Sequence, residues 1–139
     1  MRYFVNAPQR DWDHPSLVYF LGNYTETLLL TGQYQKADPY ISQLQQHHDP
    51  YYKALGELFI AMTALSQQQI PKAKEHYLIV EKITDPMPHR FGMQKTYLYY
   101  GLSKVYAAEK NTDKARLYYQ KAKDHDINHY LDTVTKPDF

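Results

Sequence analysis

Apolar side chains recur along this chain at intervals of three and four residues, a spacing that predicts α-helices. Long alternation of apolar and polar residues, which would favour strands, is missing, so the sequence predicts an all-α fold. Turn-forming residues interrupt the helical pattern near 32–33, 47–50, 67–70, 84–89, 110–112 and 125–126. These breaks divide the chain into about six helices of roughly 10–20 residues each.

Proline positions indicate where two of these helices begin. Asp13 or His14 precedes Pro15, and Asp49 precedes Pro50. In each pair the polar residue is expected as the N-cap, and proline as the first helical residue, because an amide at that position has no partner within the helix.

A short motif ending in Lys-Ala follows three of the helix breaks. Its copies are GQYQKA (32–37), QQIPKA (68–73) and KNTDKA (110–115). The alanines Ala37, Ala73 and Ala115 are 36 and 42 residues apart (73 − 37 and 115 − 73). This spacing predicts an internal repeat of helix pairs.

The residues around each alanine repeat the same apolar pattern. Four and seven places after each alanine come Ile41 and Leu44, Tyr77 and Val80, and Tyr119 and Ala122. Twelve places before each alanine stands a small residue, Thr25, Ala61 or Ser103. A small side chain at this position would let the two helices of a pair approach closely.

These columns resemble the tetratricopeptide repeat family, whose unit is a pair of antiparallel helices. The resemblance covers roughly residues 16–124. It implies three helix-turn-helix repeats that form a short right-handed superhelix. The expected organisation is an N-terminal extended segment (1–13), a repeat domain (14–125, with repeats at about 16–49, 50–86 and 88–124) and a C-terminal tail (126–139).

Four positions depart from the family pattern. Glu57 stands where the family has a large apolar residue, and Gln68 and Lys110 replace the turn glycine that Gly32 supplies in the first copy. Gly32 is expected to end the first helix in the left-handed conformation. Pro39 would disrupt a helix interior, so its helix is expected either to begin with Asp38 as N-cap or to kink at the proline.

In this family the first helix of each repeat lines a concave groove, so the resemblance implies a set of partner-binding residues. They are Tyr19, Asn23 and Glu26; Leu55, Leu58, Phe59 and Met62; and Tyr97, Tyr100 and Lys104. Gly22 and Gly101 would expose backbone in the same groove. An alternative stays open for the second group, since the stretch 50–67 is apolar almost all round and its residues suit the core equally well.

Charge and composition exclude several kinds of partner. The chain carries 16 basic and 15 acidic side chains and no cysteine. A net charge of +1 does not favour binding to nucleic acid or to an anionic membrane, and thiol chemistry is excluded. The N-terminus lacks the apolar stretch of a signal peptide, which indicates a cytoplasmic protein.

Two histidine clusters are candidate metal ligands. His47 and His48 precede Asp49, and His125 and His129 are four residues apart, which would place both rings on one helical face if that segment is helical. Neither cluster brings a third dedicated ligand, so no metal and no cofactor is expected. The sequence also lacks a nucleophile motif and a phosphate-binding glycine loop, and an enzyme is not expected.

The expected function is therefore a non-enzymatic scaffold that binds a peptide or helix segment of a partner protein in its groove. The carboxylate clamp of some family members is matched only by Asn23 and Lys104, with Glu26 opposing a carboxylate. Two alternatives remain. The chain would be a sensor or dimerisation module of a larger bacterial regulatory protein, or a structural repeat domain that associates with itself as a homo-oligomer.

Overall fold

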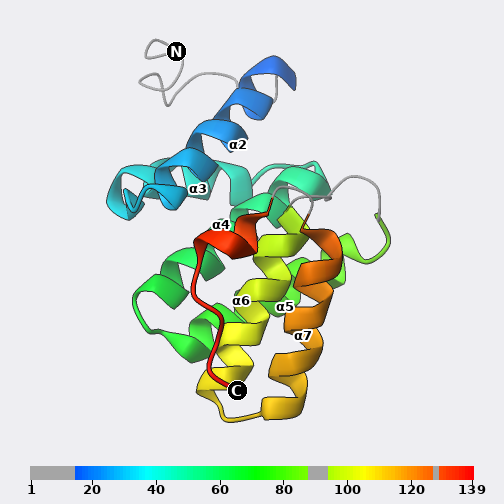
Figure 1. Ribbon diagram of the computed structural model, residues 1–139. Helices are drawn as coiled ribbons and strands as arrows, with labels where there is room; N and C mark the ends of the chain where they lie inside the picture. Colours follow the sequence, from blue (N-terminus) through cyan, green and yellow to red (C-terminus); the bar gives the residue numbers. More distant parts are fainter. Residues whose placement is uncertain (1–14, 88–93, 127–128) are drawn as a thin grey trace.

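The computed structural model describes residues 15–87, 94–126 and 129–139, and within these ranges all regular structure is helical (Figure 1). The elements are α2 (Pro15–Leu30), α3 (Tyr34–Gln45), α4 (Pro50–Ser66), α5 (Ile70–Thr84), α6 (Gln94–Ala108), α7 (Thr112–His125) and the 3-10 helix η1 (Tyr130–Thr133). The all-α prediction is confirmed, and the helices end at the predicted breaks. None of these described helices combines the length and apolar character needed to cross a membrane.

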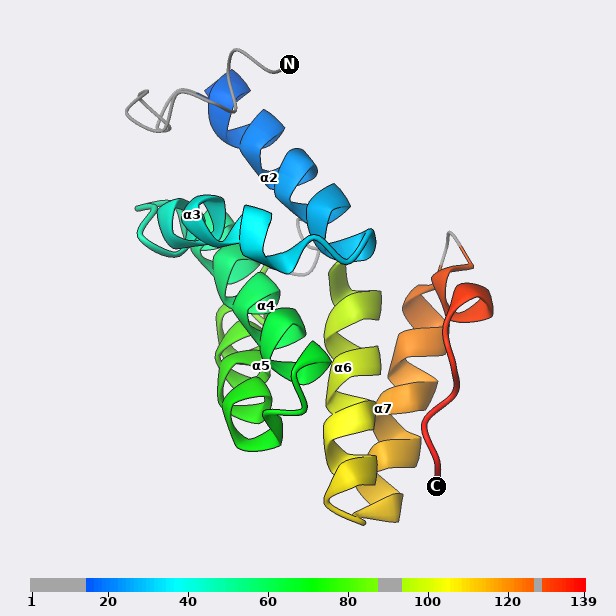
Figure 2. The same ribbon diagram turned by 90° about the vertical axis from the view of Figure 1, so that its left-hand side faces the viewer.

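Helix α4 is the centre of the structure. It packs against α2, α3, α5 and α6, and Figure 2 shows the α4–α5 pair between the α2–α3 pair and the α6–α7 pair. Leu58, Phe59 and Ala61 of α4 are fully inaccessible to solvent. The apolar character of this helix on nearly all sides is explained by this central position.

Within each of the three helix pairs, α2–α3, α4–α5 and α6–α7, the two helices are joined by a turn of the same geometry. Gly32, Gln68 and Lys110 all have left-handed backbone conformations, with φ of 78°, 61° and 62°. In each turn the next amide donates to the carbonyl five residues earlier: Gln33 to Leu28 at 2.7 Å, Gln69 to Ala64 at 2.9 Å, and Asn111 to Tyr106 at 2.9 Å. This is the hydrogen bond that closes a Schellman motif. The left-handed expectation for Gly32 is confirmed, and two residues with side chains adopt the same conformation.

Each turn delivers its alanine to the point where the paired helices touch. Ala37, Ala73 and Ala115 are completely buried. At the third of these contacts the Ser103 hydroxyl of α6 donates to the Ala115 carbonyl of α7 at 2.7 Å. A larger side chain at either position would push the helices apart, which explains why these columns hold small residues.

Pro39 lies inside α3, so the expectation that this helix begins at Asp38 is wrong. The helix begins at Tyr34, and the Ala37 amide donates to the Gln33 carbonyl at 3.3 Å. The preceding turn and the burial of Ala37 therefore determine the start of the helix. Pro39 cannot donate to the carbonyl four residues earlier, but both positions are exposed, where water satisfies the carbonyl.

The N-cap expected before α4 is confirmed. The Asp49 carboxylate accepts from the Tyr51 amide at 2.9 Å, and Pro50 is the first helical residue. Pro15 is likewise the first residue of α2, whereas its expected caps, Asp13 and His14, lie outside the described residues.

Glu57, which departs from the family pattern, is buried in a polar contact between three helices. Its carboxylate lies 2.5 Å from His76 Nδ1 of α5 and accepts a hydrogen bond from the side-chain amide of Gln45 of α3 at 3.2 Å. Beside it, a β-carbon at Gly56 would stand 2.5 Å from the Gln45 backbone nitrogen. Gly56 thus allows α3 and α4 to approach closely, and Glu57 finds its partners within that contact.

The two turns without glycine carry removable backbone strain. A left-handed residue with a side chain costs about 1–2 kcal/mol, so we expect Gln68→Gly to raise the free energy of unfolding by about 0.5–1 kcal/mol. Its neighbour Gln67 has φ of −96°, so Gln67→Gly is the matched control and should give no gain. Urea denaturation measures both, and equal effects of the two substitutions would contradict the strain.

The Glu57–His76 contact predicts non-additive mutations. His76→Leu leaves a buried carboxylate without its main partner and should cost about 3 kcal/mol of unfolding free energy. The double variant Glu57→Leu/His76→Leu should be within about 1 kcal/mol of the wild type, because apolar packing replaces a desolvated pair. A denaturant-based double-mutant cycle tests this, and additive losses would show that the two side chains act independently.

Candidate functional site

A cleft of about 630 Å³ lies between the turn joining α2 to α3, the C-terminal half of α4, helix α6 and the C-terminal residues. Its lining residues are Leu29, Leu30, Tyr34, Met62, Leu65, Ser66, Gln68, Tyr77, Tyr97, Tyr100, Lys104, Tyr130, Thr133 and Val134. Five of them are tyrosines. The cleft therefore combines apolar walls with hydroxyl groups that can form hydrogen bonds.

Tyr77 of α5 reaches the cleft from beneath α6. Its side chain crosses so close to Gly101 that a β-carbon there would overlap the ring and hydroxyl of Tyr77. A β-carbon at Gly22 would stand 2.9 Å from the Leu55 side chain. Both glycines are buried, so the expectation that they expose backbone to a ligand is wrong. Their role is to admit core side chains.

Residues 129–139, called the tail below, form one wall of the cleft. The tail runs along α6 and α7 toward the α6–α7 turn (Figures 1 and 2). The Tyr130 ring packs edge-on against Tyr97 and Tyr100, with centroid distances of 4.7 and 5.8 Å. The Tyr100 hydroxyl donates to the backbone carbonyl of Thr135 at 2.7 Å.

The start of the tail is held by a carboxylate. Asp126 accepts from the backbone amides of Tyr130 at 2.7 Å and Leu131 at 2.9 Å. These two bonds satisfy amides that η1 itself leaves unpaired. Asp126 therefore positions Tyr130 over α6.

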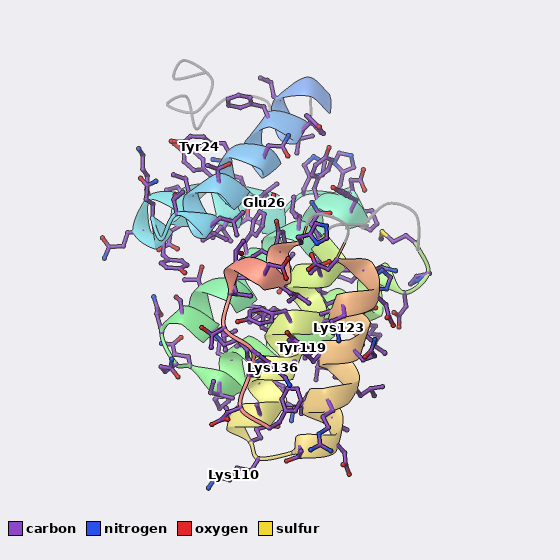
Figure 3. All side chains as sticks on the ribbon, viewed as in Figure 1. Tyr24, Glu26, Lys110, Tyr119, Lys123 and Lys136 are labelled. Atoms are coloured by element: carbon purple, nitrogen blue, oxygen red, sulfur yellow. The ribbon has the colours of Figure 1, made fainter. Side chains whose placement is uncertain are left out.

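The end of the tail lies on α7. The Phe139 ring packs against Tyr119 at a centroid distance of 5.8 Å, and the Lys136 ammonium lies 4.8 Å from Phe139 and 5.7 Å from Tyr119. Figure 3 shows Tyr119 and Lys136 on this side of the molecule. A second hollow of about 240 Å³ between Leu65, Lys104 and Pro137 adjoins the cleft here.

Burial raises the pKa of several tyrosine hydroxyls in this region. It raises the pKa of Tyr130 to about 12, and burial with the nearby Glu26 carboxylate raises the pKa of Tyr97. Burial also raises the pKa of Glu26, which the Gln94 amide opposes through a hydrogen bond of 3.5 Å. At neutral pH the hydroxyls therefore remain O–H groups that can donate.

Four of the ten residues predicted to bind a partner line the cleft. They are Met62, Tyr97, Tyr100 and Lys104. Leu55, Leu58 and Phe59 are 4%, 0% and 0% exposed. These three belong to the core, the alternative that the sequence left open, and no ligand can reach Leu58 or Phe59 in this structure.

The three remaining predicted residues lie on α2. Tyr19 is 65% exposed and Asn23 is exposed, and neither lines the cleft. Glu26 is partly buried and faces Gln94 of α6. Asn23 and Lys104 are not brought together in the cleft, so the structure does not assemble the two as a clamp.

The sequence did not identify the tail as part of the site. Tyr130 and Val134 line the cleft, and Leu131 is 9% exposed. The run YLDTV (130–134) has the apolar spacing of a short segment that packs against a helix, and this spacing is the only local indication in the sequence that the tail docks. Its docking position depends on residues 30 places earlier, and no local pattern encodes that.

The histidines do not form a metal centre in the part of the chain that the structure describes, where no group of three His, Asp or Glu side chains is placed to hold an ion. Helix α7 ends at His125, and His129 has a left-handed φ of 58°. Helix α7 therefore does not continue to His129, and the condition under which the two rings would share a helical face is not met. The His47 ring stacks on His48 and accepts from the Asp49 amide at 3.0 Å.

Comparison with protein-family models, with curated proteins and with solved structures gave no significant match. The chemistry of the cleft is therefore the basis on which a function can be proposed.

The raised pKa of Glu26 predicts a pH-dependent effect of Glu26→Gln. Because the folded state releases the Glu26 proton at a higher pH than the unfolded state, ionisation of Glu26 destabilises the fold as the pH rises. The stability of Glu26→Gln relative to wild type should therefore increase between about pH 4 and pH 7. Thermal unfolding across this range measures it, with the exposed Glu75→Gln as the control; a flat difference would contradict the shift.

Proposed function

We propose that this protein is a non-enzymatic scaffold that binds an extended peptide of a partner protein in the cleft. The observation that carries the proposal is the lining of the cleft. Apolar side chains such as Leu30, which is 47% exposed, and Met62 lie beside the hydroxyls of Tyr97 and Tyr100. Tyrosine and methionine are enriched where proteins bind one another, because they combine large contact area with adaptable geometry.

The repeated turns support a tetratricopeptide-like arrangement of three helix pairs. Equivalent positions of the three turns adopt the same left-handed backbone conformation, and each turn is followed by a buried alanine. In such an arrangement the first helices of the pairs, α2, α4 and α6, face one concave side. The cleft takes its lining from all three of these helices, as a groove along the repeats requires.

The energetics suit reversible binding. Burying a large apolar side chain is worth about 1.5–3 kcal/mol, so three anchors supply several kcal/mol before the cost of ordering the peptide. An affinity in the micromolar range is expected. The small net charge of the protein gives little electrostatic steering, so apolar contacts and hydrogen bonds determine which peptide binds.

Selection of peptides from a random phage-displayed library on the immobilised full chain tests this function. We expect peptides rich in aromatic and aliphatic residues, and Leu30→Asp should weaken their binding about tenfold or more, because the substitution places a charge in the apolar wall. Leu117 is 53% exposed on α7 and does not line the cleft. Leu117→Asp is thus a matched control and should change affinity less than about twofold.

Two results would contradict the proposal. One is a selection that yields only peptides insensitive to Leu30→Asp. The other is a stable dimer, detected by light scattering, that Leu30→Asp dissociates, because the cleft would then serve the association of two copies.

A further inference from the structure

The tail contacts α6 and α7 in the way a bound peptide contacts its receptor. Two aromatic side chains anchor it, Tyr130 against Tyr97 and Tyr100, and Phe139 against Tyr119. Between these anchors one backbone group is recognised, the Thr135 carbonyl that accepts from the Tyr100 hydroxyl. Anchors in pockets combined with hydrogen bonds to the backbone are the usual means of recognising an extended segment.

Side chains alone hold the tail in place. Among the residues that the structure describes, no backbone–backbone hydrogen bond joins the tail to α6 or α7. Leu131 is its one buried residue, whereas Asp132, Thr133, Thr135, Lys136 and Asp138 are exposed. A segment with so few buried contacts opens at a much lower free energy than the helices beneath it.

The tail also leaves the cleft beside it unfilled. Tyr130, Thr133 and Val134 line one part of the cleft, and Leu30 of α2, which is 47% exposed, lines another. A longer or bulkier segment in the position of the tail would contact both parts. The seat on Tyr97 and Tyr100 is therefore better suited to a partner that also fills the cleft.

From these contacts we propose that the tail occupies part of the peptide-binding surface, and that a partner's peptide binds by displacing it. This inference rests on the proposed function of the cleft. The occupant is an extended segment that places an aromatic ring between Tyr97 and Tyr100 and offers a backbone carbonyl to the Tyr100 hydroxyl. The tail thus competes with the partner within the same molecule, and its detachment precedes or accompanies binding.

The test uses the full chain and a fluorescent synthetic peptide, HYLDTVTKPDF, the sequence of residues 129–139. Tyr130→Ala removes one of the two aromatic anchors of the attached tail and leaves Tyr97 and Tyr100 in place. We expect this variant to bind the peptide about tenfold more tightly than the wild type does, because the internal competitor is weakened. Fluorescence anisotropy measures the affinity.

Two further variants separate competition from a general change in the fold. Asp132→Ala alters a tail side chain that is 79% exposed and contacts His129 at 3.6 Å, and this variant should bind the peptide as the wild type does. Adding Tyr100→Phe to Tyr130→Ala removes the hydroxyl that donates to the Thr135 carbonyl, and should weaken peptide binding about fivefold, the worth of one hydrogen bond. Circular dichroism confirms that each variant remains helical.

Amide hydrogen exchange distinguishes a tail that a peptide displaces from a tail with a purely structural role, because exchange in a structural tail would not respond to the peptide. Peptides selected on the cleft should accelerate amide exchange in the tail of the wild type while they slow exchange in α6. Equal affinity of HYLDTVTKPDF for wild type and Tyr130→Ala, or no binding to either, would overturn the inference. A tail exchanged between two copies, seen as a dimer by light scattering, would overturn it as well.

The two proposals can fail separately. Library peptides that depend on Leu30 but gain no affinity from Tyr130→Ala would refute displacement of the tail and leave the proposed function standing. A library without any Leu30-dependent peptide would refute the proposed function itself.

Discussion

Close approach of paired helices at three buried alanines is the constraint on which the rest of this structure depends. Ala37, Ala73 and Ala115 have no accessible surface, and each lies where a Schellman turn has just reversed the chain. The turn determines where the second helix begins, and the alanine determines how near it comes to the first. Together they fix the orientation of each pair, so that the pairs can stack and bury α4 among them.

This constraint explains which features of the fold could be predicted from the sequence. The Lys-Ala motif and the caps are local, and their geometry follows from neighbouring residues. The left-handed conformations of Gln68 and Lys110 were harder to predict, since their side chains disfavour φ values near 60°. Stacking imposes the same turn on all three copies and overrides that local preference. The helical position of Pro39 follows from the same cause.

The candidate site was predictable only in part, because burial depends on distant contacts. The helical phase selected Met62, Tyr97, Tyr100 and Lys104, which line the cleft. The same phase also selected Leu58 and Phe59, which are core residues. With three helix pairs, the central helix α4 packs against α2, α3, α5 and α6 and is covered on nearly every side. A pattern of apolar positions cannot distinguish a groove floor from a core when one helix serves both.

Under the proposed function, the affinity for a peptide depends on a balance between the contacts of the tail and those of the partner. Tyr130 of the tail packs on Tyr97 and Tyr100, whose rings are 5% and 7% exposed, and burial raises the pKa of both of these hydroxyls. Such groups bind an apolar ring and a carbonyl equally well whether these belong to the same chain or to a partner. Because the tail is covalently attached, its effective concentration at Tyr97 and Tyr100 is high. A partner's peptide must therefore bind tightly enough to compete with the tail and to offset the free energy needed to detach it. A weakly held tail therefore lowers the affinity for every peptide that reaches the seat on Tyr97 and Tyr100. The proposed function therefore favours peptides that also contact the cleft lining at Leu30, and the proposed displacement of the tail would make binding at Tyr97 and Tyr100 more selective.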